Sequence, residues 1–426
     1  MKYFTSLIFT LALSVALFSG TAEAKYVAGF NLTETYGFQY DAAVGDAPKT
    51  LAQKAVDEAK RLGSNHIILN VRATMTGPDS TEIIPVTPPA ERSKEAMRMG
   101  RLIKYIQAQG LTVGIRPIFF VVGPNGEFPY TEKLADGTSK VWWHGNIQPR
   151  DPNRWFESFR VYLDVYIAVA RMAKADEFTI GAELYSMTVG IEDQWKEYPY
   201  GFPGRWLELL RYTRSKLPTA RLMYDINFTD DSNSAGGLTA SGGEFERWRF
   251  RLVELAHPKN PEEAAIWNDL STFWKELDAV GLDIYRSLAS PNQVLPTDYN
   301  ELVAVLKNRA DSYATQLDTG LMEIEFVLEH QKKAIIKEIG FRSVEKGFVD
   351  PFAYAGTGTL NVKHQTAGYA AIFEAFWKPQ WPWFAGINFW DIAVDESKRG
   401  PQDTGFSPLG KVPTEDVVKG YFLNNN

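Results

Sequence analysis

The chain has 426 residues, a formal net charge of −7 and no cysteine. The acidic balance and the lack of a basic block argue against a nucleic-acid partner, and the absence of cysteine excludes a fold held by disulfides. The length fits one elaborated domain or two average ones.

The first 24 residues predict an export signal. Lys2 precedes an apolar run from Leu7 to Phe18, and a small-residue stretch ends in Ala22-Glu23-Ala24. This is the pattern of a cleavable signal peptide, whose apolar part is too short for a permanent anchor. We therefore expect a secreted or periplasmic protein without a stable membrane anchor. Its folded part, residues 25–426, is expected to be a single domain, because no linker or repeat divides it.

Short apolar segments alternate with longer amphipathic ones in the rest of the chain, which is typical of a parallel sheet covered by helices. Helix signals include the three-and-four spacing from Met99 to Ile106, closed by Gly110, and the cap and first turn at Asp151-Pro152. The eight strand candidates are Tyr26–Asn31, His66–Arg72, Thr112–Ile118, Phe178–Glu183, Leu222–Asn227, Val280–Tyr285, Ala334–Glu338 and Phe384–Trp390. This order predicts an α/β fold, a (β/α)8 barrel of the TIM type. Long βα insertions are expected after the third and fifth strands, at residues 121–150 and 229–246.

Alternation within the strands predicts which side chains face the barrel interior. In the fourth candidate, Phe178 and Ile180 share one parity, whereas Gly181 and Glu183 share the other. Large apolar groups mark the face under the helices, so the second set is expected to point inward. Lys337 is an exception, because it falls on the outward parity of its strand. The same reasoning puts other polar or aromatic groups at the barrel mouth, namely Arg72, Asp283, Tyr285, Asn388 and Trp390.

Glu183 and Glu338 each end a strand candidate, at the rim where such barrels build their active sites. Two carboxyls facing each other there suit hydrolysis of a glycosidic bond, in which one protonates the leaving oxygen and the other attacks the sugar or activates water. We interpret Glu183 as the acid/base and Glu338 as the nucleophile. The nucleophile must stay ionised, so we expect Arg72 and Tyr285 to donate to it. The acid must hold its proton, which requires a less polar setting or a negative neighbour.

A set of motifs resembles a known family. The segments, in chain order, are WWHGNIQPRDPNRWFESF, EFTIGAELYSM, KEIGF, INFWDI and DTGFSPLGK. Together they resemble glycoside hydrolase family 113, a group of retaining (β/α)8-barrel enzymes, over nearly all of the mature chain. The resemblance implies acid/base catalysis by Glu183, nucleophilic attack by Glu338, and action on β-1,4-linked mannan or manno-oligosaccharides. Much of the wider clan has Asn directly before the acid/base, where this chain has Ala182, so Asn227 and Asn388 are the amides available to contact the sugar's 2-hydroxyl.

Several rim residues have two interpretations. Trp143 and Trp390 suit stacking on a sugar ring, although a large core also contains such residues. Asp225 and Asp283 could compete with the glutamates in catalysis, or accept hydrogen bonds that orient other site residues. The expected substrate-binding residues are Arg72, Trp143, Asn227, Asp283, Tyr285, Asn388 and Trp390.

Neither a metal nor a cofactor is expected. The five histidines lack paired ligand spacing, and no glycine-rich phosphate loop follows the first strand. The expected partner is a neutral polysaccharide or oligosaccharide. Two alternatives remain: the same mechanism on another β-glycan, such as a glucan, xyloglucan or chitosan-like polymer, and a secreted carbohydrate-binding protein without catalysis. The paired glutamates argue against the second, because a binding module does not need them.

Overall fold

The computed structural model describes residues 26–33, 49–192, 194–229, 242–353 and 358–425. The signal peptide expected at residues 1–24 therefore lies outside the described residues. Within the ranges given, no helix combines the length and apolarity needed to cross a bilayer.

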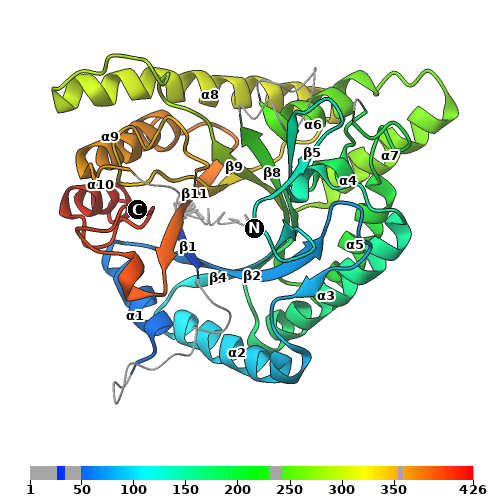
Figure 1. Ribbon diagram of the computed structural model, residues 1–426, viewed down its shortest axis with the longest axis horizontal. Helices are drawn as coiled ribbons and strands as arrows, with labels where there is room; N and C mark the ends of the chain where they lie inside the picture. Colours follow the sequence, from blue (N-terminus) through cyan, green and yellow to red (C-terminus); the bar gives the residue numbers. More distant parts are fainter. Residues whose placement is uncertain (1–25, 34–48, 193, 230–241, 354–357, 426) are drawn as a thin grey trace, which may run out of the picture.

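A closed barrel of parallel strands forms the centre of the molecule, with helices around it (Figure 1). β1 pairs with both β11 and β2, which closes the ring. The eight barrel strands are β1 (Val27–Thr33), β2 (His66–Thr76), β4 (Thr112–Val122), β7 (Glu177–Ala182), β8 (Arg221–Thr229), β9 (Ala279–Tyr285), β10 (Ala334–Glu338) and β11 (Phe384–Ala393). Each begins within one residue of its strand candidate, so the predicted (β/α)8 fold is confirmed.

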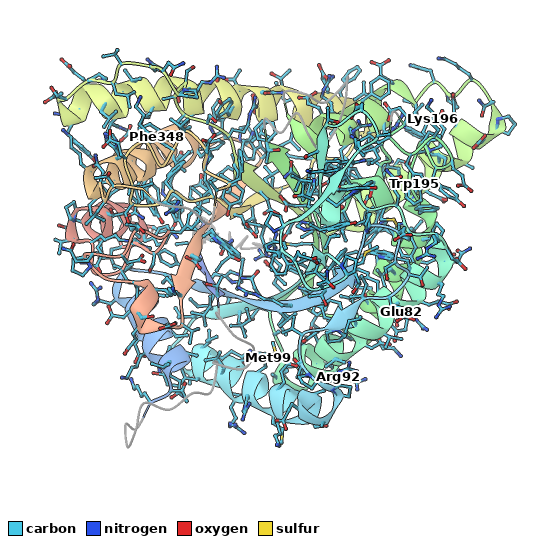
Figure 2. The ribbon with its side chains drawn as sticks, in the orientation of Figure 1. Glu82, Arg92, Met99, Trp195, Lys196 and Phe348 are labelled. Carbon is cyan, nitrogen blue, oxygen red and sulfur yellow. The ribbon has the colours of Figure 1, made fainter. Side chains whose placement is uncertain are left out.

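The helices between the strands cover the outside of the barrel (Figure 1). They are α1 (Leu51–Arg61), α2 (Arg92–Ala108), α3 (Pro152–Ala173), α4 (Tyr185–Thr188), α5 (Pro203–Lys216), α6 (Gly243–Glu254), α7 (Pro261–Glu276), α8 (Tyr299–Leu328), α9 (Val362–Ile372) and α10 (Val412–Phe422). The expected helix signals hold: α2 is followed by Gly110 at φ +79°, and Asp151 caps α3 by accepting from the Arg154 N–H. Met99, labelled in Figure 2, is fully buried on the side of α2 that packs into the core.

The insertion expected at residues 121–150 contains a hairpin of β5 (Tyr130–Lys133) and β6 (Ser139–Trp142), followed by a 3₁₀ turn at His144–Asn146. β2 and β4 pair along their whole length, up to Thr76 and Val122, and β3 (Ile84–Pro85) pairs antiparallel to β2. These elements extend one side of the barrel beyond the C-terminal ends of the shorter barrel strands. The insertion expected at 229–246 lies partly outside the described residues.

The barrel interior is layered. Met223, Ala279 and Ile335, all near strand starts, form a small apolar cluster at its N-terminal end. Above it, Lys337 forms a fully buried ion pair with Glu177 of β7. Ile335 and Lys337 share the inward parity of β10, and a register shift between Ile336 and Glu338 in the β9–β10 pairing lets Glu338 face inward as well.

Candidate active site

Arg116 of β4 is the centre of a buried polar layer near the C-terminal ends of the strands. Its Nε donates to Asp225 Oδ2 at 2.7 Å, and one Nη donates to Asp283 Oδ2 at 2.6 Å. The other Nη donates to Glu338 Oε1. A single fully buried cation thus holds carboxyls from β8, β9 and β10, which fixes the carboxyl at the end of β10 in place.

Glu338 has donors on both oxygens. Tyr285 donates its hydroxyl to Oε2 at 2.8 Å, as expected, but the cation on the other oxygen is Arg116 instead of Arg72. Arg116 pairs with Asn70 across the β2–β4 ladder, whereas Arg72 lies two residues nearer the mouth. Its guanidinium carbon is 5.8 Å from the centroid of the Phe120 ring. The expected role of Arg72 as the partner of Glu338 is therefore corrected.

Glu183 reaches the site by an irregular backbone. The β7–β8 register shifts between Thr179 and Ala182, and Glu183 has φ +55°, in the left-handed region that non-glycine residues seldom adopt. Gly181 was expected to face inward with Glu183, but it faces outward. A Cβ on Gly181 would lie 2.7 Å from the ring of Trp206, which belongs to the outer helix α5. Glu183 thus enters the mouth through a bulge and a left-handed residue, not through simple alternation.

The Glu183 carboxyl is held by two side chains. Asn227 Nδ2 donates to Oε1 at 2.7 Å, and the Asn227 amide is oriented by the Thr229 hydroxyl, which donates to Oδ1 at 2.9 Å. The other oxygen, Oε2, lies 2.9 Å from Nε2 of His144, which follows β6. His144 packs edge-on against Trp143, with ring centroids 4.9 Å apart. The insertion after β4 thus supplies a partner for the carboxyl that follows β7.

The two glutamates have pKa values shifted in opposite directions. Burial raises the pKa of Glu183, but the hydrogen bond and charge of His144, the charge of Arg116 and the Asn227 hydrogen bond outweigh it, so the net pKa is lowered. Burial also raises the pKa of Glu338, and although Arg116 and Tyr285 oppose this, the negative charge of Glu183 reinforces it, so the net pKa is raised. In the free protein these directions favour a proton on Glu338, the reverse of the order expected for the two roles.

The other expected binding residues divide by exposure. Trp143, Tyr285 and Trp390 are partly exposed, and the Trp143 indole N–H is buried without a hydrogen-bond partner among the described residues. Asp283 and Asn388 are fully buried, and Asn388 Oδ1 lies 2.0 Å from where a Cβ on Gly29 would be. Full burial places these two residues beneath the mouth of the barrel, below the partly exposed aromatic side chains.

Three site features were not predicted from the sequence. Arg116 has a recognisable signal, because it is the only charge in the apolar run TVGIRPIFF. His144 belongs to the WWHGN segment, but its pattern gives no role. The third feature, a buried pair formed by Tyr224 and Glu244, gives no signal in the sequence. Over the described part of the chain, no group of three or more acidic or histidine side chains is arranged to hold a metal ion.

Comparison with known proteins finds one family whose model matches most of the chain, and solved structures that share its fold. A family model described as Glycoside Hydrolase Family 113 matches residues 35–200 and 265–411. The β-mannanase AaManA of that family from Alicyclobacillus acidocaldarius, solved in complex with ManMIm, is 18% identical, with 95% of this chain and 99% of that chain covered and a TM-score of 0.61. A complex of a GH113 β-1,4-mannanase is 17% identical, with 94% and 99% covered and a TM-score of 0.58. No curated protein matches the chain. At these identities the structural likeness shows the barrel fold alone.

Proposed function

The chain belongs to glycoside hydrolase family 113 and is a glycoside hydrolase, and we propose that it cleaves β-1,4-linked mannan or manno-oligosaccharides by double displacement. Both similar solved structures are described as β-mannanases, one of them as a β-1,4-mannanase, which supports the choice of sugar. The observation that carries the proposal is that Glu183 and Glu338 are held at the same level of one end of the barrel. Asn227, which binds the Glu183 carboxyl, pairs with Asp283 of β9, and Asp283 pairs with Glu338 of β10.

In the first step, a carboxylate oxygen of Glu338 attacks the anomeric carbon while Glu183 gives its proton to the leaving oxygen. Arg116 and Tyr285 orient the attacking carboxylate. In the second step, Glu183 takes a proton from water, whose oxygen replaces Glu338 on the sugar. The two roles are assigned as the family resemblance implies, with the acid/base directly after β7 and the nucleophile at the end of β10.

The proton must be on Glu183 when the first step begins. In the free protein the pKa of Glu183 is lowered and that of Glu338 is raised, so the proposed mechanism requires substrate binding to reverse this order. His144 can form a hydrogen bond with either form of the Glu183 carboxyl. An Nε2 without hydrogen accepts from a neutral Glu183, and an Nε2–H group donates to an ionised one. His144 thus matches either charge state of the acid/base.

The test measures reducing ends released from mannan, glucomannan, cellulose and xylan. We expect hydrolysis of mannan by the wild type and a loss of several orders of magnitude in Glu338→Ala, because the covalent step is removed. Glu254→Ala, at an exposed glutamate of α6, is the control. Equal rates for wild type and Glu338→Ala would reject the mechanism and favour a non-catalytic binding protein. Cleavage of another β-glycan but not mannan would keep the mechanism and change the sugar.

A further inference from the structure

Two buried side chains behind Glu183, Tyr224 of β8 and Glu244 of α6, contact the backbone on both sides of the carboxyl. The Leu184 N–H donates to the Tyr224 hydroxyl at 2.9 Å, and this hydroxyl contacts Glu244 Oε1 at 2.8 Å. The Asn227 N–H donates to Glu244 Oε2 at 3.1 Å. One pair of residues therefore holds both the residue that follows Glu183 and the residue whose amide binds its carboxyl.

The backbone at Glu183 needs such support. A left-handed φ at a non-glycine residue costs free energy and persists only where neighbouring contacts enforce it. The Glu183 N–H still bonds to the Asp225 carbonyl at 2.8 Å, but β7 has ended, and the next N–H turns to the Tyr224 side chain instead. Without that hydroxyl, the Leu184 N–H would be buried and unpaired.

The first turn of α6 is fitted closely onto Asn227. Gly243 has φ +56°, and a Cβ there would lie 2.4 Å from Asn227 Oδ1. The Trp248 indole N–H donates to Glu244 Oε1 at 3.0 Å, so each oxygen of Glu244 accepts from an N–H group. Tyr224 and Glu244 are both fully buried, so neither touches a sugar. Both lie between the two segments that the family model matches, at 35–200 and 265–411.

We propose that Tyr224 and Glu244 are positioning residues that hold the Glu183 carboxyl in line for proton transfer, an inference that rests on the proposed glycosidase function. Proton transfer requires heavy atoms about 2.6–3.2 Å apart, so a small displacement of the carboxyl slows it strongly. A merely structural role would lower stability and slow all substrates alike. A positioning role slows the steps that need the Glu183 proton.

The charge state of Glu244 fits this role. Burial raises the pKa of Glu244 to about 8, and the negative charge of Glu183 contributes. At neutral pH Glu244 is therefore mainly uncharged and does not place a second anion behind the acid/base. Glutamine is nevertheless a poor substitute, because an amide nitrogen in place of either oxygen leaves the N–H of Asn227 or Trp248 unpaired.

The test compares Tyr224→Phe and Glu244→Gln with Glu246→Gln, a control in the same helix turn whose side chain bonds to Gln316 and Arg249, away from the site. Two substrates are used: manno-oligosaccharide, which needs protonation of its leaving oxygen, and a dinitrophenyl β-mannoside, which does not. For both test variants we expect kcat/KM on the oligosaccharide to fall about 10- to 100-fold. On the aryl mannoside kcat/KM should stay within about threefold, while kcat and KM fall together because the second step slows. Thermal unfolding shows that each variant is folded.

Equal losses of kcat/KM on both substrates, or no loss on either, would overturn the positioning role. If Glu244→Gln does not fold, the result for Tyr224→Phe decides whether the positioning role holds, because this change removes only one oxygen atom. If the wild type cleaves neither substrate, the proposed function has failed. The positioning of the Glu183 carboxyl is then tested by NMR titration of ¹³C-labelled protein, in which the Glu183 signal is identified by its loss in Glu183→Gln. A changed titration midpoint in Tyr224→Phe, with none in Glu246→Gln, supports the inference, and an unchanged midpoint rejects it.

Discussion

At the scale of single residues, the contact between His144 and Glu183 affects the protonation of the carboxyl that we propose as the acid/base. After burial, which raises the pKa of Glu183, the His144 hydrogen bond is the largest influence, and it lowers that pKa. His144→Ala should therefore raise the pKa of Glu183. In the proposed mechanism activity requires protonated Glu183, so the alkaline limb of the kcat/KM profile should move to higher pH. Profiles on manno-oligosaccharide test this.

His257→Ala, at an exposed histidine, is the matched control and should leave both limbs unchanged. An alkaline limb that stays in place or moves to lower pH would contradict the prediction. Movement of the acidic limb alone would mean that Glu183 must be ionised, and the roles of Glu183 and Glu338 would be exchanged. The experiment therefore also tests the order of roles that the pKa directions of the free protein put in question.

Residue identity at strand ends was partly predictable. Glu183, Glu338, Tyr285 and Asn227 meet around the site as the strand pattern suggested. The expected contact of Arg72 with Glu338 was wrong because Arg72 and Arg116 both lie on inward parity, and only the β2–β4 register shows that Arg116 lies deeper in the barrel. Sequence alternation gives the direction of a side chain but not its depth in the barrel.

At the scale of elements, bulges decide which side chains enter the barrel. The β7–β8 and β9–β10 pairings each shift by one residue near the site. The first shift is followed by the left-handed residue Glu183, and the second lets Lys337 and its neighbour Glu338 both face inward. A period-two pattern cannot reveal a bulge, because the extra residue changes the parity of everything after it. Parity counted back from Glu338, which follows the shift, therefore assigns Lys337 to the wrong face.

The interior of β9 offers a stability test. A Cβ on Gly281 would lie 2.0 Å from Asp225 Oδ1 and 2.6 Å from the Lys337 side chain. Asp225 is fully buried and paired with Arg116, so it has no free space. Gly281→Ala should lower the free energy of unfolding by about 1–3 kcal/mol and reduce kcat, because Arg116 also holds Glu338. Urea unfolding and turnover of manno-oligosaccharide measure these effects.

Gly100→Ala is the matched control. Gly100 lies within α2, and among the described residues no atom beyond the backbone of its own helix turns and its chain neighbours is within 4 Å of a Cβ built there. Alanine should raise the free energy of unfolding by about 0.5–1 kcal/mol, because it restricts the unfolded chain and favours helix. A Gly281→Ala protein as stable as Gly100→Ala would show that the interior layer can rearrange.

At the scale of the whole molecule, the fold was the most predictable feature. Eight apolar segments separated by amphipathic ones leave few arrangements other than a closed parallel barrel, and each segment carries its own signal. The support of the site was less predictable, because Tyr224 and Glu244 are brought to Glu183 by tertiary packing between β8, α6 and the end of β7. Such contacts have no fixed spacing along the chain.

The C-terminal end of the described chain is bound to the start of the first barrel strand. Asn425, after α10, accepts from the Tyr26 N–H at 3.1 Å and donates to the Tyr26 carbonyl at 2.7 Å, which ties the end of the described chain to the start of β1. Asn425→Ala should lower the free energy of unfolding by about 1–3 kcal/mol, since two partly buried hydrogen bonds are lost. The neighbouring Asn424→Ala removes only an exposed bond to the Gly420 carbonyl and should change stability little. Equal urea midpoints for the two variants would mean that the two Asn425 bonds do not stabilise the position of β1.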